Sequence, residues 1–473
     1  MNHLVWFRRD LRTLDNSALQ QALELASMSQ DSNVIALFIE TPGQWQEHNL
    51  APIQADLILR RLHEVSAELK ELNISMIFER CDSFSDCADV LSRLCQRHHI
   101  NRLWANKEYE LNEVKRDELV AETLTNVGVE SRFIDDSCMF SPGEVLNQQG
   151  SYFKVFTPFK KAWLSKFASR PVPVSKPPRL EHNALTIQSE LSFNYPLKDS
   201  SAYPISTKEI ITKLREFAAE KASDYSDDRD FPAIEGTSKL SPYLAIGALS
   251  VRQCLARLFN GRHLEELSAG EQTWLSELIW REFYQHLLYF EPKLSRGQCF
   301  TPWGDMLVWQ GDEEHLEKWQ QGETGYPIVD AAMKQLNRTG WMHNRLRMIV
   351  ASFLTKDLLL DWHDGEAYFS QTLVDGDYAA NNGGWQWSAS TGCDAQPYFR
   401  IFNPISQGEK FDPDGSFVKH WLPELVDVPI KYIHKPWLWA EFGSLDYPQP
   451  IVDHKAQREK ALEMYKEARE RAK

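Results

Sequence analysis

Short hydrophobic runs alternate with amphipathic stretches through the first third of the chain, and this alternation limits the fold more than any other feature. The runs are rich in β-branched and aromatic residues and occupy positions 3–7, 33–39, 75–79, 102–106 and 131–134. Strand-like runs separated by helical repeats predict βαβ units, in which successive strands lie parallel. We therefore expect an α/β domain over residues 1–135, built on a doubly wound, Rossmann-like parallel sheet.

The motif that usually binds a dinucleotide is missing from this domain. A Rossmann site needs Gly-x-Gly-x-x-Gly after the first strand, because glycines let the backbone approach the pyrophosphate. Here the sequence after the first run reads RRDLRTLDNSAL, over residues 8–19. The sheet is not expected to bind a dinucleotide in the Rossmann manner.

Composition changes after residue 135. Residues 136–206 are rich in Pro and Ser, and the stretch SRPVPVSKPP at 169–178 cannot sustain a helix or a central strand. From residue 207 the 3.6-residue period dominates up to a charged helix after Val452. We expect an interdomain linker over 136–206 and an all-α domain over 207–473.

Net charge, cysteine spacing and hydrophobicity limit which class of protein this chain can belong to. The net charge of −15 opposes indiscriminate coating of nucleic acid, so any nucleic-acid site must be a local basic patch. The seven cysteines are scattered without a Cys-x-x-Cys pair, which predicts free thiols and no metal site. No stretch has the length and apolarity of a membrane span or a secretory signal. We expect a soluble, cytoplasmic monomer.

The segment EGTSKLSPYLAIGALS, at 235–250, predicts a helix start. Ser241 would be the N-cap and Pro242 the first helical residue. Hydroxyl groups, backbone N–H groups and a helix dipole at one place suit a phosphate or pyrophosphate. Segments of this kind also cap helices without binding anything, and from these residues alone both interpretations stay open.

Two helical segments combine charged groups with aromatic or amide groups. Residues 274–290 place Trp274, Glu277 and Arg281 on one helix face, where they would grip an aromatic phosphate ligand or form an intrahelical Glu–Arg ion pair. Residues 340–348 place Asn344 beside Arg345, which suits a base edge and a phosphate, or simply a solvated basic face.

The stretch DGDYAANNGGWQWSAS, at 375–390, brings carboxylates, amides, glycines and tryptophans together. Its Asp-x-Asp start is typical of a calcium loop, but Ala379, Ala380 and Gln386 stand where that loop needs oxygen ligands and glycine. Asn-Asn-Gly-Gly instead predicts a tight turn that lets the backbone approach something flat beside the tryptophans.

Taken together, these segments resemble the DNA photolyase/cryptochrome family. The resemblance is carried by TGYPIVDAAMKQLNRTGWMHNRLRM at 324–348, DGDYAANNGGWQWSASTG at 375–392 and YFRIFNP at 398–404. It extends from HLVWFRRDLR at 3–12 to LDYPQPIVDHK at 445–455. Within the family the chain is most similar to the bacterial class I cyclobutane pyrimidine dimer photolyases.

The resemblance implies a U-shaped flavin adenine dinucleotide (FAD), reduced and anionic when active, in the helical domain. Asn381 would face flavin N5, and the flat object beside the predicted turn would be the isoalloxazine ring. The full set of implied FAD-binding residues is Tyr225, Thr237, Ser238, Lys239, Leu240, Ser241, Trp274, Arg347, Asp375, Gly376, Asp377 and Asn381.

The implied reaction is light-driven electron donation from reduced FAD to a pyrimidine dimer flipped out of UV-damaged DNA. The residues implied to act on the dimer or the flavin are Glu277, Asn344, Met348 and Asn381. Those implied to contact DNA are Arg229, Glu277, Trp280, Arg281, Asn344, Arg345, Trp387, Arg400 and Gln407. The family's electron relay would consist of Trp309, Trp362 and Trp385.

The α/β domain resembles the family's antenna-binding domain. His48, Asn112 and Glu113 match positions that contact a methenyltetrahydrofolate antenna, whereas Ser295 and Arg296 stand where a Cys-Lys pair is expected. This departure leaves the antenna undecided between the folate and another chromophore.

Two other functions compete with DNA repair. A cryptochrome-type blue-light photoreceptor would share the fold and the flavin, but the plant forms resemble this pattern with Asp where this chain has Asn381. A folate- or flavin-dependent redox enzyme unrelated to DNA would leave the tryptophan, asparagine and arginine rim without a purpose.

Overall fold

The computed structural model describes residues 1–29, 31–168, 172–187 and 189–473. Its single described sheet holds five parallel strands in the order β3-β2-β1-β4-β5. The doubly wound α/β domain predicted from the sequence is thereby confirmed. The strands are β1 (Asn2–Phe7), β2 (Asn33–Glu40), β3 (Ser75–Arg80), β4 (Arg102–Asn106) and β5 (Glu130–Ile134).

Helices cover both faces of the sheet, which is why the strands are hydrophobic at successive positions. On one face, α1 (Ser17–Ser27) and α3 (Pro52–Glu71) pack against alternate residues of β1 and β2. On the other face, α4 (Cys87–Arg97) and α5 (Leu111–Asn126) pack against the intervening residues. The short α2 (Pro42–Glu47) follows β2 directly.

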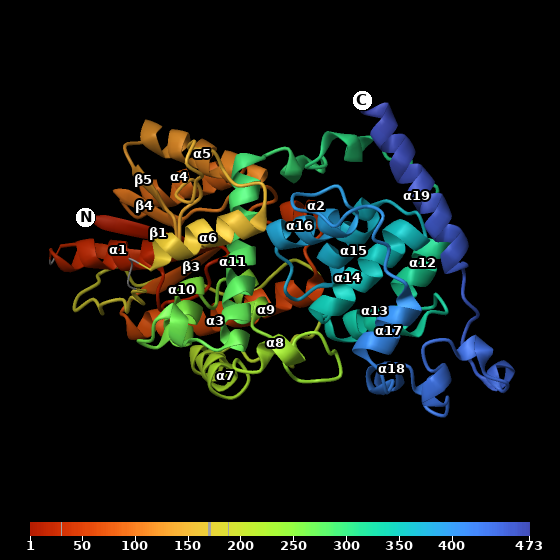
Figure 1. Cartoon of the computed structure of the whole chain (residues 1–473). Coiled ribbons are helices and arrows are strands. Elements are labelled where there is room, and N and C mark those ends of the chain that lie inside the picture. Colours follow the sequence, from red (N-terminus) through yellow and green to blue (C-terminus); the bar gives the residue numbers. More distant parts are fainter. Residues whose placement is uncertain (30, 169–171, 188) are drawn as a thin grey trace.

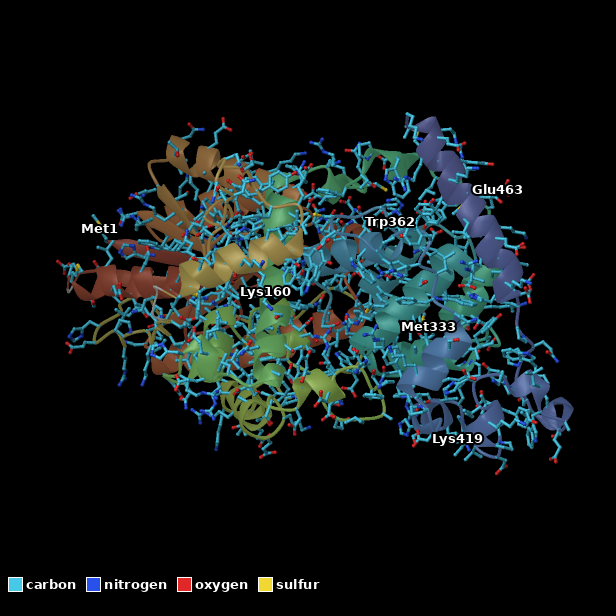
Figure 2. The ribbon with its side chains drawn as sticks, in the orientation of Figure 1. Met1, Lys160, Met333, Trp362, Lys419 and Glu463 are labelled. Carbon is cyan, nitrogen blue, oxygen red and sulfur yellow. The ribbon has the colours of Figure 1, made fainter. Side chains whose placement is uncertain are left out.

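Outside the sheet, the regular secondary structure of the described chain is helical. The long helix α11 runs between the sheet side and the other helices, and α19 lies at the outer edge (Figure 1). Figure 2 shows Trp362 inside this domain and Glu463 projecting from α19. The α-helices are α6 (Phe156–Phe167), α7 (Thr207–Glu220), α8 (Tyr225–Asp228), α9 (Ser241–Ala245), α10 (Val251–Phe259), α11 (Ala269–Phe290), α12 (Glu313–Gln321), α13 (Pro327–Thr339), α14 (Asn344–Ser352), α15 (Trp362–Thr372), α16 (Tyr378–Ser388), α17 (Pro404–Phe411), α18 (Ser416–Trp421) and α19 (His454–Arg471).

Shorter helical turns complete the domain. A π-helical segment, Phe353–Asp357, continues α14. The 3-10 turns are Leu264–Glu266, Leu294–Arg296, Pro302–Met306, Pro423–Leu425, Ile430–Tyr432, Pro436–Leu438 and Phe442–Ser444. Among the described helices, none combines the length and hydrophobicity that crossing a membrane requires.

The two parts of the chain share one hydrophobic core, which contains side chains of α1 and α3 together with side chains of α10 and α11. Gly247, at φ 68°, allows the loop after α9 to contact the loop after β1, since a Cβ there would lie 2.2 Å from the Arg9 carbonyl oxygen. The predicted boundaries at residues 135 and 206 stay predictions. Residues 169–171 and 188 of the predicted linker lie outside the described residues.

Candidate active site

The stretch predicted as a tight turn is part of helix α16. The Asp377 carboxylate caps this helix by accepting from Ala380 N at 3.0 Å, and Asn381 N donates to the Asp377 carbonyl at 2.9 Å. The turn prediction is wrong, because an N-cap aspartate followed by alanines propagates helix through Asn381 and the two glycines. The two glycines lie inside the helix and do not reverse the chain.

The two glycines of α16 have opposite surroundings. A Cβ at Gly383 would lie 2.3 Å from the Tyr284 ring, so this glycine lets α16 pack closely against α11. A Cβ at Gly384 would meet no atom within 4 Å, and Ala380, one turn earlier, is exposed. One side of α16 is therefore packed, and on the other side Ala380 and Gly384 leave open space.

Asn381 is oriented by the protein beside this open side. Its Nδ2 donates to the Glu366 carbonyl at 3.0 Å and to Ser370 Oγ at 3.1 Å. These bonds leave Oδ1 as the acceptor end of the amide. A hydrogen-bond acceptor beside a surface of small side chains suits the polar edge of a flat ring.

The loop before α16 is held by charge pairs. The Arg347 NH2 group donates to both Asp375 carboxylate oxygens, at 3.0 and 2.8 Å, and Asp375 is buried. Gln54 of α3 donates to the Gly376 carbonyl at 2.8 Å, and Arg9 lies 3.5 Å from the Asp377 carboxylate. Both domains thus position the three predicted ligands Asp375, Gly376 and Asp377.

The predicted phosphate segment begins its helix one residue earlier than expected. Leu240 is the N-cap of α9 and Ser241 the first helical residue, without a side-chain capping bond. The N-cap prediction for Ser241 is wrong, because Lys239 takes a left-handed conformation, with φ 50°, and turns the chain into the helix early. What the segment offers a phosphate is hydroxyl and backbone N–H groups beside the half-buried Thr237 and Ser238.

Buried aromatic residues join α7, α8 and α11 next to this segment, whose Gly236 lies against Asp228 of α8, since a Cβ there would lie 2.5 Å from the Asp228 Cβ. Trp274 and Tyr225 both pack against Phe217 of α7, at ring-centroid distances of 4.9 and 5.9 Å. The Lys239 ammonium lies 5.4 Å from the Trp341 ring and pairs with Glu235 at 2.7 Å. Phe217 thus connects two of the predicted ligands, Tyr225 and Trp274.

Helix α14 presents a polar face next to an ion pair. Asn344 is exposed and Met348 half-buried, one helical turn apart. Between them, Arg345 pairs with Asp230 at 2.8 Å and lies over the Phe411 ring at 4.4 Å. Sequence reasoning missed Asp230, although it directly follows the predicted Arg229.

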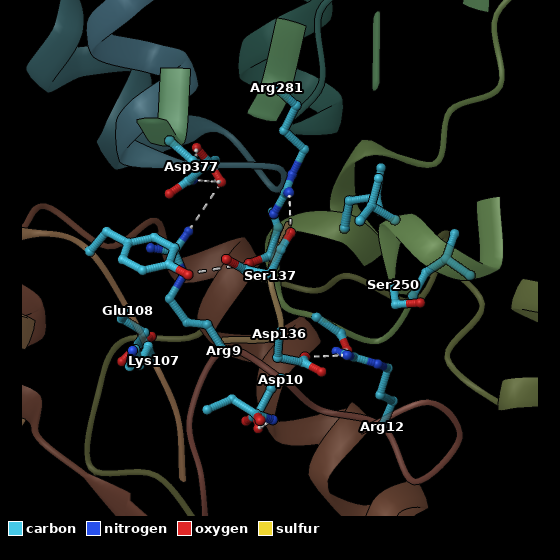
Figure 3. Close-up of a pocket in the computed structure, with 18 of the residues that line it drawn as sticks. Arg9, Asp10, Arg12, Lys107, Glu108, Asp136, Ser137, Ser250, Arg281 and Asp377 are labelled. Atoms are coloured by element: carbon cyan, nitrogen blue, oxygen red, sulfur yellow. Dashed lines mark hydrogen bonds and ion pairs between the residues drawn. The ribbon is translucent and has the colours of Figure 1, made fainter. Parts of the chain in front are cut away.

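The intrahelical Glu277–Arg281 pair that the sequence allowed is not formed. Glu277 pairs with Arg229, beyond the end of α8. Arg281 donates to the Ser137 carbonyl at 2.9 Å and points into a small polar cavity between the domains (Figure 3). The assignment of Arg281 to the DNA-facing rim stays a prediction, but its guanidinium lies in this cavity.

An aromatic stack stands beside Glu277. Trp280 stacks on Phe156 of α6 with ring centroids 3.6 Å apart and planes inclined by 9°. Sequence reasoning missed Phe156, because it belongs to the segment predicted as linker. Trp387 and Gln407 are half-buried, and Arg400 is exposed. These three DNA-contact assignments stay predictions.

The predicted relay residues differ in exposure. Trp385 and Trp362 are buried, at 2% and 1% exposure, whereas Trp309 is partly exposed. The Trp385 ring packs directly on Gly365, one turn after Trp362 on α15, because a Cβ at Gly365 would lie 2.1 Å from it. Trp309 lies against the same hydrophobic cluster from outside. Two buried tryptophans and a partly exposed one suit a relay, and the relay assignment stays a prediction.

A larger cavity of about 500 Å³ lies between the domains and is bordered by His48, Asn112, Glu113 and Ser295. Asn112 Nδ2 lies 2.9 Å from His48 Nε2, and burial, followed by the neighbouring Glu110 and Glu108, raises the pKa of Glu113 to about 8. The cavity brings together four of the five predicted antenna residues. The fifth, Arg296, is exposed and is not among the lining residues.

The residues that the structure describes include no candidate metal site. No group of three or more His, Cys, Asp or Glu side chains there is arranged to hold a metal ion.

Family comparisons match both parts of the chain. The DNA photolyase model matches residues 3–178, and the model for the FAD binding domain of DNA photolyase matches residues 274–467. The deoxyribodipyrimidine photo-lyase of Vibrio cholerae is 53% identical over 98% of this chain and 99% of its own length, and that of Escherichia coli is 49% identical over 99% of both.

Solved structures of the same kind superpose over nearly all of the chain. A class III photolyase from Agrobacterium tumefaciens has a TM-score of 0.85 at 33% identity, covering 99% of this chain and 98% of that one. A Synechocystis cryptochrome has a TM-score of 0.87 at 26% identity, covering 98% and 99%. Since relatives about half identical match over almost its full length, the chain belongs to the DNA photolyase family.

Proposed function

We propose that this chain is a light-driven deoxyribodipyrimidine photo-lyase, which binds FAD in its helical domain and splits cyclobutane pyrimidine dimers in DNA. Support comes from the full-length relatives that carry this enzyme name and from the FAD-binding model, whose match contains α14, α15 and α16. The alternative of a cryptochrome-type photoreceptor has weaker support, because the cryptochrome among the solved structures is only 26% identical.

The residues present fit a flavin. Gly384 and Ala380 leave the space that a flat ring needs, and Asn381 Oδ1 is the free end of an amide whose Nδ2 is held by the protein. When bound, reduced FAD supplies a photoexcited electron to the dimer and takes it back after the ring opens. Arg347 and Asp375 hold the loop that borders this space, and the hydroxyl groups of Thr237 and Ser238 suit the phosphates.

The choice of the cyclobutane dimer over the (6-4) photoproduct as the substrate rests on the side chains at the start of α14. Asn344 and Met348 share the accessible side of α14, whereas His343 is 2% exposed and uses Nδ1 to accept from Arg345 N at 3.2 Å. Burial lowers the pKa of His343 to about 4, so its imidazole is neutral at physiological pH. An amide holds a base edge and a thioether packs against the cyclobutane, but neither transfers a proton.

The other residues of the pocket suit a flipped, uncharged dimer. The Trp280–Phe156 stack offers an aromatic wall, and the Glu277 carboxylate remains a hydrogen-bond acceptor while Arg229 compensates its charge. A dimer leaves the duplex more readily than normal bases, because its pairing is already disrupted. We assign Arg229, Arg345 and Arg400 to the phosphates around it.

The lesion experiment tests this proposal. The reduced, FAD-loaded protein is illuminated with matched oligonucleotides that carry either a cyclobutane dimer or a (6-4) photoproduct, and restoration of thymine absorbance is followed. We expect restoration of the dimer only. Asn344→Ala should weaken dimer binding by 1–3 kcal/mol, about 5- to 150-fold, whereas Asn126→Ala, an exposed amide on α5, should change nothing. Efficient turnover of the (6-4) substrate would overturn the assignment.

For the cavity between the domains we propose methenyltetrahydrofolate as the antenna. A carboxyl with the raised pKa of Glu113 is largely protonated at neutral pH and can donate to a pterin ring. A second flavin is the alternative occupant, because a solved photolyase from Sulfolobus tokodaii is described as holding two FAD molecules. Reconstitution with each chromophore, followed by excitation spectra of flavin emission, separates the two.

The remaining proposals concern the setting of the enzyme. We propose that it acts as a monomer in the cytoplasm, on UV-damaged DNA. A sedimentation experiment at micromolar concentration checks the monomer, and a mass of twice the 54.8 kDa chain would contradict it.

A further inference from the structure

Two of the seven cysteines lie in contact although the sequence separates them by a loop. Cys81 directly follows β3, and Cys87 is the first residue of α4. Their sulfur atoms are 3.7 Å apart, the thiol of each also lies near the Ser83 carbonyl, and both cysteines are free. Closing this distance to a disulfide of about 2 Å requires side-chain rotation and a small loop adjustment.

The surroundings favour a thiolate on Cys87. It lies at the N-terminus of α4, where the helix dipole favours negative charge. The hydrogen bond with Cys81 lowers the pKa of Cys87, against its burial, and the charges of Arg116 and Arg8 act in the same direction. The same bond raises the pKa of Cys81. Cys87 is thus suited to act as the nucleophile, and Cys81 is the partner that keeps its proton.

Both sulfurs are reachable by a small oxidant. Cys87 is itself buried, at 1% exposure, but it borders the 500 Å³ cavity between the domains, and Cys81 is partly exposed. Cys95, on the same helix, is equally buried but borders neither of the two cavities between the domains, and burial raises its pKa to about 12. A buried thiol of that kind is chemically inert at neutral pH.

We propose that Cys81 and Cys87 are a redox pair, which a peroxide oxidises to a disulfide at the wall of the interdomain cavity. The Cys87 thiolate attacks the O–O bond of hydrogen peroxide, so that an S–O bond forms and hydroxide leaves. The Cys81 sulfur then attacks the Cys87 sulfenic acid, the S–S bond forms, and the S–O bond breaks. In total, two thiols and one peroxide give one disulfide and two waters.

The loop closed by this disulfide shapes the cavity. Its Phe84 packs edge-on against His48 at 5.5 Å and lies under the Arg116 guanidinium at 4.6 Å. Its Asp82 carbonyl accepts from Gln44 N at 3.0 Å and so holds α2, the helix that precedes His48. Joining the two ends of the loop would therefore fix one wall of the cavity in a single position.

The test is cysteine mapping on the folded, full-length protein. The protein is treated with a small excess of hydrogen peroxide, remaining thiols are alkylated under denaturing conditions, and peptides are identified by mass. After tryptic digestion, we expect the single peptide 81–93, which holds both cysteines, to be unalkylated and lighter by two hydrogen atoms, and to be alkylated at both after dithiothreitol. Cys95→Ser, on the same helix, should leave this cross-link intact.

Two single variants distinguish the roles. In Cys81→Ser, the sulfenic acid on Cys87 has no partner, and dimedone should trap it there. In Cys87→Ser, Cys81 should remain alkylatable after peroxide and form no dimedone adduct. Full alkylation of both cysteines after peroxide treatment of the parent, or a cross-link that appears only in denatured protein, would overturn the proposal.

Discussion

At the residue scale, the Trp385→Phe variant tests electron relay separately from flavin binding. Its indole Nε1 has no hydrogen-bond partner among the described residues, so Trp385→Phe loses ring area but no hydrogen bond. We expect normal FAD content and normal repair by pre-reduced enzyme, but photoreduction of oxidised FAD slowed by about tenfold or more, at least 1.4 kcal/mol in barrier. Absorbance of the flavin under steady illumination with an external donor measures the rate.

A neighbouring tryptophan supplies the control for this variant. Trp319 lies 6.1 Å from Trp385 and donates from Nε1 to the Val350 carbonyl at 3.1 Å. Trp319→Phe should cost stability, since that carbonyl loses its donor, yet leave photoreduction unchanged. Photoreduction as fast in Trp385→Phe as in the parent would show that Trp385 is not in the relay.

His363 gives a pH dependence with a definite sign. Its Nδ1 lies 2.7 Å from Asp361 Oδ1 and its Nε2 lies 2.6 Å from the Gly297 carbonyl, so both ring nitrogens can donate when the ring is protonated. Burial opposes the charge, but these acceptors raise the pKa of His363 to about 9. The stabilisation is complete below the unfolded pKa of about 6.5 and is lost as pH rises through about 9.

Thermal unfolding measures this effect. Between pH 6.5 and 9, the melting temperature of the parent should fall relative to that of His363→Gln, whose side chain does not titrate. A difference between the two proteins that stays constant over this range would mean that His363 keeps one protonation state throughout.

At the scale of the element, α16 is packed on one side and open on the other. Gly383→Ala would push a methyl group into the Tyr284 ring, so we expect destabilisation by about 1–3 kcal/mol and weaker FAD retention. Gly384→Ala meets no atom within 4 Å and gains about 0.4–1 kcal/mol from the reduced freedom of the unfolded chain.

The Gly384→Ala variant also tests what occupies the open side of α16. If the isoalloxazine ring lies there, Gly384→Ala should stabilise the FAD-free protein but bind FAD more weakly. Urea unfolding of the FAD-free protein and FAD titration are the two measurements. Unchanged FAD affinity in Gly384→Ala would move the ring away from this side of α16.

At the scale of the whole molecule, a buried charge cluster joins the domains. Asp136 lies between Arg12, from the loop after β1, and Arg252 of α10, whose NH2 is 2.7 Å away. Burial opposes ionisation, but the two guanidiniums hold the pKa of Asp136 well below its usual range. Its stabilising effect is therefore present above the unfolded pKa of about 3.9 and lost as pH falls through the lower folded value.

Asp136→Asn should reduce the free energy of unfolding at pH 7 by about 3–5 kcal/mol, because it leaves the buried Arg12 guanidinium without a carboxylate, whereas Arg252 keeps Asp15 at 2.9 Å. Asp135→Asn is the matched control. Asp135 pairs with Lys107 at 2.9 Å at a partly exposed site, where such a pair contributes about 0–1 kcal/mol. Urea unfolding of both variants measures the contrast, and equal losses would contradict the interdomain role of Asp136.

The sequence by itself determined the features that depend on local order along the chain. Hydrophobic alternation placed all five strands to within one residue at either end, and the helical period located the helical region from residue 207 and, within it, α11. The family motifs identify the photo-lyase, and they predict Asn344, Met348 and the relay tryptophans as site residues. These features follow from the periodicity of the side chains and from residue type, and both can be read from residues that are neighbours in the sequence.

Only the tertiary structure decided which distant groups meet. Glu277 pairs with Arg229 and not with Arg281. Phe156 stacks on Trp280. Arg252 of the second domain pairs with Asp136. The stretch expected to turn is helical, because the Asp377 cap and the Tyr284 ring favour a helix that Asn-Asn-Gly-Gly alone would not form. Contacts of this kind join residues far apart in the chain, and their pairing depends on how the elements pack, which local pattern does not encode.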